Sequence, residues 1–360
     1  MLVNKKNYKT IWTNNKNDIF IIDQTRLPFD FIEYQLKSLK DAELAISSMQ
    51  VRGAPLIGIT AAFGIHLAMQ ESTSDNNLKH AIKSLKNTRP TAINLSWAVE
   101  RVFAKLIKIE EKNRIIKSLE IAKEMALEDE IINKKIGLNG SSIIEELYRK
   151  KGNTINILTH CNAGWLATVD WGTATSPIYI AREKNIPIHV WVDETRPRNQ
   201  GAYLTAWEFE NESIDYSIIT DNAGGHLMQN KFVDLVITGS DRMTFKGDVC
   251  NKIGTYLKAI AAKENKVPFY AALPSSTIDW KIDNVKDIII EERNPNEVHF
   301  VRGKDKSGNI IDVRITPAKS KASNYSFDVT PSKYITGIIT EHGVSQANEL
   351  EIAKINQKNK

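Results

Sequence analysis

The chain has 360 residues, of which 42% are hydrophobic, so it can bury a sizeable core in two domains or in one large domain with an appendage. Its net charge of +5 comes from 48 basic and 43 acidic residues spread along the chain, which argues against a nucleic-acid-binding protein and suits a small anionic substrate. No segment approaches the roughly 18 apolar residues of a membrane span, and the first residues lack the apolar core of a signal peptide, so we expect a cytoplasmic protein that does not contact a membrane.

The first part of the chain is predicted to be mostly helical. Residues 1–30 contain two short β-prone segments, YKTIW and DIFIID, which indicate a small antiparallel hairpin. From residue 38 to about residue 130, apolar residues recur at helical spacing, as in PLIGITAAFGIHLAMQ and NLSWAVERVFAKLIKI. We therefore predict a small, mostly helical N-terminal domain with a short β-hairpin over residues 1–135.

The second part has the pattern of a parallel sheet. After Gly152, short and almost continuously apolar runs alternate with segments long enough to form helices, which is typical of strands buried on both faces and joined by helical crossovers. We predict an α/β fold with a Rossmann-like C-terminal domain over residues 136–360, and its strands at TINILTH, IPIHVWVDE, DYSIITD, VDLVITGSD and VPFYAALP. The polar stretch 301–326 is predicted to be a surface loop.

Polar residues stand where these apolar runs stop, and the carboxyl edge of an open α/β sheet is where ligands bind. The chain has no Gly-x-Gly-x-x-Gly fingerprint and no Walker loop, so dinucleotide and nucleoside triphosphate binding are weakly supported. Its histidines are scattered without the spacing of a zinc site, so we expect no bound metal. The polar groups at the strand ends are His160-Cys161-Asn162, Asp193-Glu194, Asp221-Asn222 and Ser240-Asp241-Arg242.

Two of these residues are candidates for chemistry. Cys161 precedes a turn and a helix start, where backbone N–H groups would lower the pKa of its thiol, but a buried structural cysteine fits the spacing equally well. Asp241 directly follows a buried strand, where desolvation would raise the pKa of its carboxyl toward the range of a general acid. A salt bridge between Asp241 and Arg242 is an equally good interpretation of that pair.

Three cations are candidates for holding a phosphate. Arg52 and Gly53 precede Pro55, a favourable first helical residue, so backbone amides and the guanidinium could hold an anion together. A helix start with an exposed arginine is the alternative. Arg89 and Lys252 stand beside turn signals and carry little weight individually.

A series of motifs, taken together, resembles a known family. In chain order they are RGAPLIGITAAFG, RPTAINLSWA, THCNAG, DETRPRNQG, LTAWE, GSDR, GDVCNKIGTY, EER, FDVTP and GIITE. They resemble the methylthioribose-1-phosphate isomerases of methionine salvage, which are related to the regulatory subunits of eukaryotic initiation factor 2B and to ribose-1,5-bisphosphate isomerase. The resemblance runs from about residue 5 to residue 345, and it implies a cofactor-free, homodimeric aldose–ketose isomerase whose substrate is a small phosphorylated sugar.

The resemblance also assigns residues. The family's catalytic cysteine falls on Cys161 and its catalytic aspartate on Asp241. The sequence departs from the family at Trp165, Ser240 and DNAGGHLM, which puts the group tolerated at the 5-position of the sugar in doubt. We expect Trp165 or Trp171 to border that end of the pocket with apolar surface. The substrate-contacting residues of the family fall on Arg52, Gly53, Ala54, Arg89, Gln200, Asn251 and Lys252.

A mechanism follows from the chemistry of a sugar whose ring is locked by a phosphate ester at C1. A protonated Asp241 can donate to the ring oxygen, after which hydrogen passes from C2 to C1. Cys161 is either the base of an enediolate path or part of a dry pocket for a direct hydride shift, and the sequence leaves both open. The alternatives are a 5-deoxyribose-1-phosphate isomerase of the same family and a non-catalytic regulatory subunit. The presence of both Cys161 and Asp241 argues against the regulatory subunit.

Overall fold

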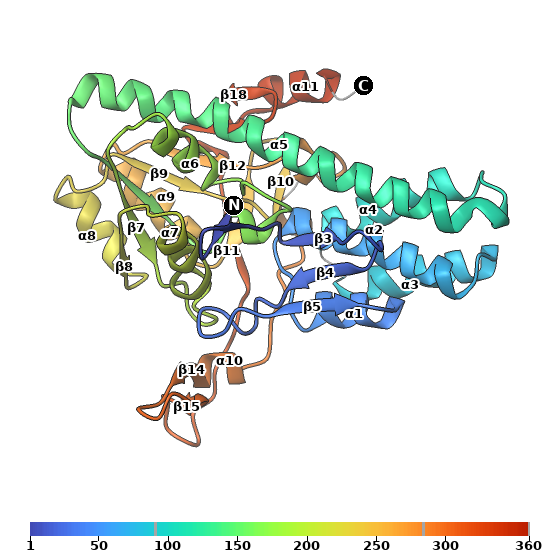
Figure 1. Ribbon diagram of the computed structural model, residues 1–360. Helices are drawn as coiled ribbons and strands as arrows, with labels where there is room; N and C mark the ends of the chain where they lie inside the picture. Colours follow the sequence, from blue (N-terminus) through green and yellow to red (C-terminus); the bar gives the residue numbers. More distant parts are fainter. Residues whose placement is uncertain (90–91, 283–284, 359–360) are drawn as a thin grey trace.

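The computed structural model describes residues 1–89, 92–282 and 285–358 (Figure 1). Its first strands form two small antiparallel sheets, and the larger contains a third strand in addition to the predicted hairpin. This strand, with the sequence EYQL, buries only Leu36 fully, so it carries little hydrophobic signal. The sheets are β1 (Leu2–Val3) with β2 (Lys6–Asn7), and β3 (Ile11–Thr13), β4 (Ile19–Ile22) and β5 (Glu33–Leu36).

Helices make up the rest of the first part, and one of them lies at its centre. The residues from Leu56 to Met69 are all buried, because the other helices pack around this segment. A helix that is apolar on every side is stable only when it is surrounded in this way. The central helix is α2 (Ala54–Glu71), and its neighbours are α1 (Leu39–Ser47), α3 (Asp75–Thr88), α4 (Ile93–Leu106) and the long α5 (Arg114–Lys151).

The second part is built on a seven-stranded sheet with the strand order β18-β17-β12-β9-β6-β7-β8. All pairings are parallel except that of the edge strand β18. The apolar runs of the sequence supply five of the strands, as predicted. The strands are β6 (Ile155–Thr159), β7 (Ile188–Asp193), β8 (Tyr216–Ile219), β9 (Leu235–Thr238), β12 (Phe269–Ala272), β17 (Gly337–Thr340) and β18 (Gly343–Ser345).

Helices cover both faces of this sheet (Figure 1). Alternate strand residues point to opposite faces, so Ile157 of β6 packs in one cluster with α5 and α6, whereas Leu158 packs in another with α8 and α9. The sheet is therefore buried on both sides, as the continuous apolar runs predicted. The remaining helices are α6 (Ser176–Glu183), α7 (Ala206–Asn211), α8 (Ala223–Gln229), α9 (Thr255–Glu264) and α11 (Glu349–Lys358).

A second, four-stranded sheet was not expected from the sequence. It places Asn251 and Lys252 opposite Asp328 and Phe327 of the neighbouring strand. Its strands have two to four residues each, too short to give a periodic signal of their own. They are β10 (Arg242–Thr244), β11 (Val249–Lys252), β13 (Ile278–Asp279) and β16 (Phe327–Thr330), in the order β13-β10-β11-β16.

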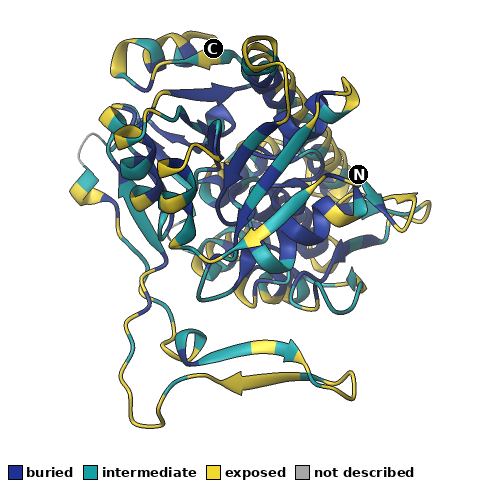
Figure 2. Ribbon diagram, turned by 90° about the vertical axis from the view of Figure 1, so that its left-hand side faces the viewer, coloured by how far each residue is buried: buried dark blue, intermediate teal, exposed yellow. Residues whose placement is uncertain are grey.

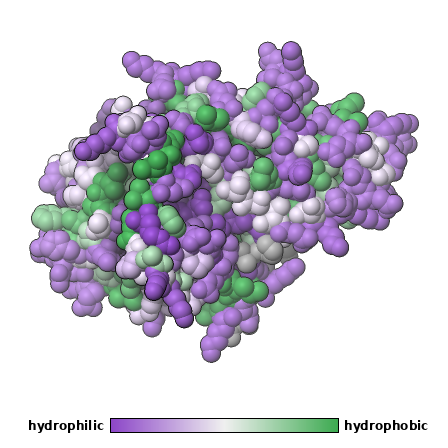
Figure 3. Space-filling view, turned by 90° about the horizontal axis from the view of Figure 1, so that it is seen from below, coloured by the Kyte–Doolittle hydropathy of each residue, from purple (hydrophilic) through white to green (hydrophobic). Residues whose placement is uncertain are grey.

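The polar stretch predicted as a surface loop contains a hairpin. After α10 (Asn296–His299), β14 (Phe300–Lys304) pairs with β15 (Ile310–Arg314), and Figure 2 shows this arm projecting from the body with little buried surface. From below, on the side where the arm projects, the surface is mostly hydrophilic with separate apolar patches (Figure 3). The hairpin contacts the first part of the chain at Lys304, whose Nζ donates to the carbonyl of Phe29 at 3.0 Å.

The long helix α5 joins the two parts. Ile121 and Met125 belong to the core of the first part, and Ile136 and Ile144 belong to the core under the large sheet. Because α5 runs unbroken through residue 135, the division of the chain at that point stays a prediction. Among the described helices, none is both long and apolar enough to cross a membrane.

Candidate active site

The residues proposed from the sequence, with the exception of Lys252, line a set of adjoining cavities. Cys161 and Asp241 line one cavity of about 30 Å³ together with Arg52, Gly53, Ala54 and Asn251. A second cavity of about 30 Å³ shares Ala54 and Asp241 and adds Arg89. A wider cavity of about 680 Å³ shares Arg52 and adds Gln200. The segment before α2 and the carboxyl ends of β6 and β9 therefore meet at one place.

Cys161 follows β6 in a left-handed backbone conformation with φ of 66°, and only 7% of it is exposed. Its N–H donates to Thr195 Oγ1 at 2.8 Å, and its thiol donates to Gln200 Oε1 at 3.4 Å. Burial raises the pKa of the thiol, and the opposing effect of Arg52 and Lys252 is smaller. The predicted lowering is wrong because burial outweighs these effects. In addition, no α-helix starts here: residues 165–167 form a 3-10 turn, and α6 begins only at Ser176.

Asp241 lies beyond β9, where its N–H donates to the carbonyl of Cys250 at 3.0 Å. Desolvation raises the pKa of its carboxyl, in the direction that the sequence predicted, while the cations Lys252, Arg52 and Arg89 oppose the shift. Neighbouring Arg242 pairs with Asp279 at 3.7 Å. Asp241 is therefore a desolvated carboxyl surrounded by cations, the environment of a group that must hold a proton and then release it.

Three cations approach this carboxyl from different parts of the chain. Only 7% of Arg52 is exposed, so it is not the exposed arginine of the alternative interpretation. Burial lowers the pKa of Lys252, whose ammonium lies 4.8 Å from the centre of the Phe327 ring. Arg89 lies 3.7 Å from Glu291, and its buried Nε has no hydrogen-bond partner within residues 1–89, 92–282 and 285–358. An anionic ligand would offset the charge that these cations bring together.

Gly53 brings the start of α2 against the loop that follows Cys161. Its φ of 95° is unfavourable for any residue with a side chain, and a Cβ at this position would lie 2.5 Å from the Cβ and the carbonyl oxygen of Ala167. Only glycine allows this approach. The close contact places Arg52, the preceding residue, over the same loop.

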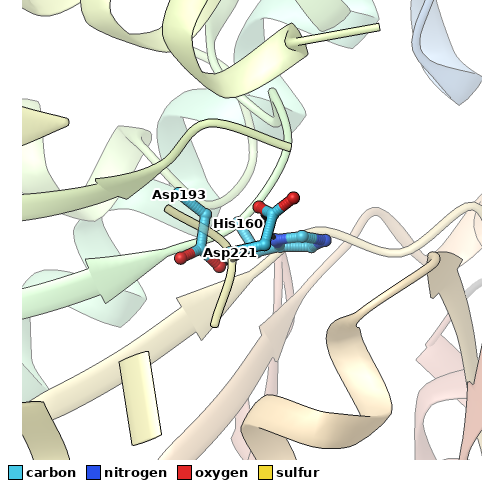
Figure 4. Close-up of side chains that lie close together, drawn as sticks. All are labelled: His160, Asp193 and Asp221. Carbon is cyan, nitrogen blue, oxygen red and sulfur yellow. Dashed lines mark hydrogen bonds and ion pairs between the residues drawn. The ribbon is translucent and has the colours of Figure 1, made fainter. Parts of the chain in front are cut away.

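A cluster of His160, Asp193 and Asp221 lies behind the cysteine at the ends of β6, β7 and β8 (Figure 4). Their potential ligand atoms lie within 4.8 Å of one another. The Lys258 ammonium is 2.8 Å from Asp193 Oδ2, however, and the ring nitrogens of His160 face Asp193 and the carbonyl of Ile253, each at 2.8 Å. Lys258 and the hydrogen bonds of the His160 ring therefore occupy most of these ligand atoms, and only Asp193 Oδ1 lacks a hydrogen-bond partner among the described residues. A site whose ligand atoms are already paired with an ammonium group and backbone does not suit a metal ion.

The sequence did not identify the residues that hold the segment around Cys161. Thr205 Oγ1 donates to the carbonyl of Cys161 at 2.7 Å, and Glu208 accepts hydrogen bonds from residues 162, 165 and 166. The available signal was the acidic residue inside the apolar segment TAWEF, where a charge must find partners if the helix is buried.

The tryptophans expected to border the pocket lie elsewhere. Trp165 is fully buried in the core under the large sheet, with its ring centre 6.0 Å from that of Trp207. Trp171 lies beneath Lys134, whose ammonium is 5.0 Å from its ring centre. Neither lines the three cavities described above, so their expected role at the 5-position of the sugar is wrong.

Comparison with known proteins identifies the family of this chain. The profile of the Initiation factor 2 subunit family matches residues 50–347. A methylthioribose-1-phosphate isomerase of Sinorhizobium medicae is 54% identical over 352 residues, which are 97% of this chain and 97% of the relative. This chain belongs to the methylthioribose-1-phosphate isomerase family.

Two solved structures of related proteins have the same fold as this isomerase family member. The crystal structure of 5-methylthioribose 1-phosphate isomerase from Pyrococcus horikoshii has a TM-score of 0.85 and 38% identity, and the match covers 98% of this chain and 97% of that one. The crystal structure of the translation initiation factor eIF-2B subunit delta from A. fulgidus has a TM-score of 0.82 and 36% identity, with 98% and 100% covered. The predicted family and α/β fold class are confirmed.

Proposed function

We propose that this chain is an aldose–ketose isomerase that converts 5-methylthioribose 1-phosphate into 5-methylthioribulose 1-phosphate in methionine salvage, without a cofactor. The observation that carries the proposal is that Asp241 and Cys161 line one small cavity together with Arg52. A carboxyl that can protonate the ring oxygen, a neighbouring thiol and a phosphate-binding cation are what the reaction requires of a protein.

In this proposal the 1-phosphate is held by Arg52, Arg89 and Lys252, assisted by the backbone at Gly53 and Ala54, where α2 begins. Guanidinium groups bind phosphate oxygens strongly, and the start of a helix adds partial positive charge. The predicted contacts of Gln200 and Asn251 orient the sugar over the thiol. Cations from both halves of the chain thus act on one group.

Asp241 opens the sugar ring. The anomeric oxygen is esterified, so the ring opens only when an acid protonates the ring oxygen. The raised pKa of the carboxyl keeps a larger fraction of Asp241 protonated than an exposed aspartate would have. As the pH rises, Asp241 loses this proton, and turnover falls.

Hydrogen then passes from C2 to C1 as a hydride, while the C2 hydroxyl returns a proton to the Asp241 carboxylate and leaves the ketone at C2. The state of Cys161 favours this direct transfer. Burial raises the pKa of this thiol, so it holds its proton and is a poor base for removing one from C2. The test is a substrate with deuterium at C2 in ordinary water. Deuterium retained at C1 of the ketose supports direct transfer, whereas its replacement by solvent hydrogen would contradict it and support the enediolate path, for which Cys161 is the candidate base.

The second candidate is a non-catalytic regulatory subunit, because the initiation-factor structure from A. fulgidus covers the same chain length at 36% identity. Such a subunit would bind a sugar or nucleotide phosphate without turnover, so a turnover assay separates the two functions. Comparing kcat/KM for the methylthio, 5-deoxy and 5-phospho sugars separates the substrate classes within the isomerases. We further predict a cytoplasmic homodimer that does not bind nucleic acid.

A further inference from the structure

Glu208 on α7 is a fully buried carboxylate with a complete set of donors. Its Oε1 accepts from Asn162 Nδ2 and from the N–H of Leu166, both at 2.9 Å. Its Oε2 accepts from the Tyr179 hydroxyl at 2.7 Å and from the N–H of Trp165 at 3.2 Å. Burial raises the pKa of Glu208 to about 7, and these donors favour its ionised form.

Asn162 lies between this carboxylate and Arg52. Its Nδ2 donates to Glu208 and, at 3.1 Å, to Thr205 Oγ1, whose own hydrogen is given to the carbonyl of Cys161. Both neighbours on that side accept hydrogen bonds, so the nitrogen of the amide must face them and its oxygen must face Arg52. Arg52 Nη1 donates to that oxygen, and Nη2 donates to the Asn162 carbonyl at 2.7 Å.

The chain also lies directly against Glu208. A Cβ added to Gly164 would lie 1.7 Å from Glu208 Oε2, so no larger residue fits there while the carboxylate keeps its place. Glu208 lines none of the cavities described around the site. It can therefore affect catalysis only through the residues that it holds.

We propose that Glu208 is a positioning residue that fixes the orientation of the Asn162 amide and, through it, the guanidinium of Arg52. The inference rests on the proposed role of Arg52 in binding the substrate phosphate. In this arrangement the Asn162 amide links the Glu208 carboxylate on α7 to the Arg52 guanidinium before α2. The amide cannot be flipped, because its nitrogen must donate to Glu208 and its oxygen must accept from Arg52.

The test replaces the hydrogen-bond donor of Asn162 with an acceptor. In Asn162→Asp an oxygen replaces Nδ2 at 2.9 Å from Glu208. Two carboxyl groups so close share one proton, which is lost as the pH rises. N162D should keep activity at low pH and lose about 100-fold in kcat/KM, relative to wild type, at high pH, because a displacement of about 1 Å in a positioned group can cost that much. Adding Glu208→Gln supplies a new donor, so N162D/E208Q should recover at least about tenfold of that loss and lack the new pH dependence.

The matched control is Glu212→Gln. Glu212 is the buried carboxylate after the end of the same helix, and it pairs with Arg182 at 2.7 Å, outside the three cavities. N162D/E212Q should behave like N162D. Equal kcat/KM and pH profiles for N162D/E208Q and N162D would overturn the proposal.

Two further measurements separate the possible failures. Arg52→Ala should raise KM, and an unchanged KM would remove the role of Arg52 itself and leave the isomerase activity standing. If N162D does not fold, the single variants E208Q and E212Q are compared instead. The proposal expects KM to rise by about tenfold in E208Q only, as the loss of one charge-assisted contact would give. Equal KM values for the two variants would overturn the proposal.

Discussion

Replacing Gly53 by alanine tests whether the close contact between α2 and the loop after Cys161 is needed. A side chain at φ of 95° costs about 1–2 kcal/mol. The added Cβ would also lie 2.5 Å from Ala167, and such overpacking costs about 1–3 kcal/mol. Gly53→Ala should therefore lower the free energy of unfolding by about 2–5 kcal/mol. It should also raise KM for the sugar phosphate, since Arg52 moves with the start of α2.

Gly152→Ala is the matched control. Gly152, at the end of α5, has a φ of 70°, and a Cβ there would find nothing within 4 Å. This variant should lose only the backbone contribution of about 1–2 kcal/mol and keep the KM of the wild type. Urea denaturation gives the first quantity and steady-state kinetics the second. If the two alanine variants were equally stable and equally active, the contact between Gly53 and Ala167 would have no role in shaping the site.

The remaining predictions concern charge. Asp241→Asn should lower kcat by about 100- to 10,000-fold without unfolding the protein, since the amide cannot protonate the ring oxygen; near-normal kcat would remove Asp241 from the mechanism. Arg89→Ala should raise KM by about 10- to 100-fold, as loss of a charge-assisted phosphate contact does; unchanged KM would refute this assignment. The pKa of Glu208 is raised from 4.5 to about 7, so between these pH values the folded state binds a proton that the unfolded state has lost. The contribution of Glu208 to the free energy of unfolding should therefore fall by about 3 kcal/mol as the pH rises from 4.5 to about 7. Urea denaturation of wild type and Glu208→Gln across that range should show this fall in wild type only. Activity should survive treatment with EDTA, since the Lys258 ammonium already pairs with Asp193 where a metal ion would lie in the His160 cluster; loss of activity that added metal restores would contradict this.

The parallel sheet was predictable because its strands are buried on both faces. A run such as VDLVITGSD has a buried, mainly apolar centre at residues 235–238, and its polar end must lie at the carboxyl edge of the sheet. Cys161 and Asp241 follow two strands that reach this edge, so their proximity followed from topology alone. The strands of the second sheet gave no such signal, because they have only two to four residues each.

The properties that depend on the packing of several elements were not predictable. The thiol pKa was expected to be lowered, because backbone N–H groups were considered without the burial that outweighs them. Trp165 or Trp171 was expected at the pocket, yet Trp165 is fully buried in the core under the large sheet, beside Trp207 of α7. Glu208 stands in a quoted motif, but its role depends on Asn162, 46 residues earlier in the chain.

Turnover of 5-methylthioribose 1-phosphate by the purified protein tests the central claim most directly. Phosphorus and proton NMR can follow the loss of the anomeric C1 signal and the growth of the ketose. We predict that the wild-type protein converts the substrate with no added cofactor, and that Asp241→Asn binds the substrate but loses turnover. A wild-type protein that binds the sugar phosphate without converting it would contradict the account and favour the regulatory function.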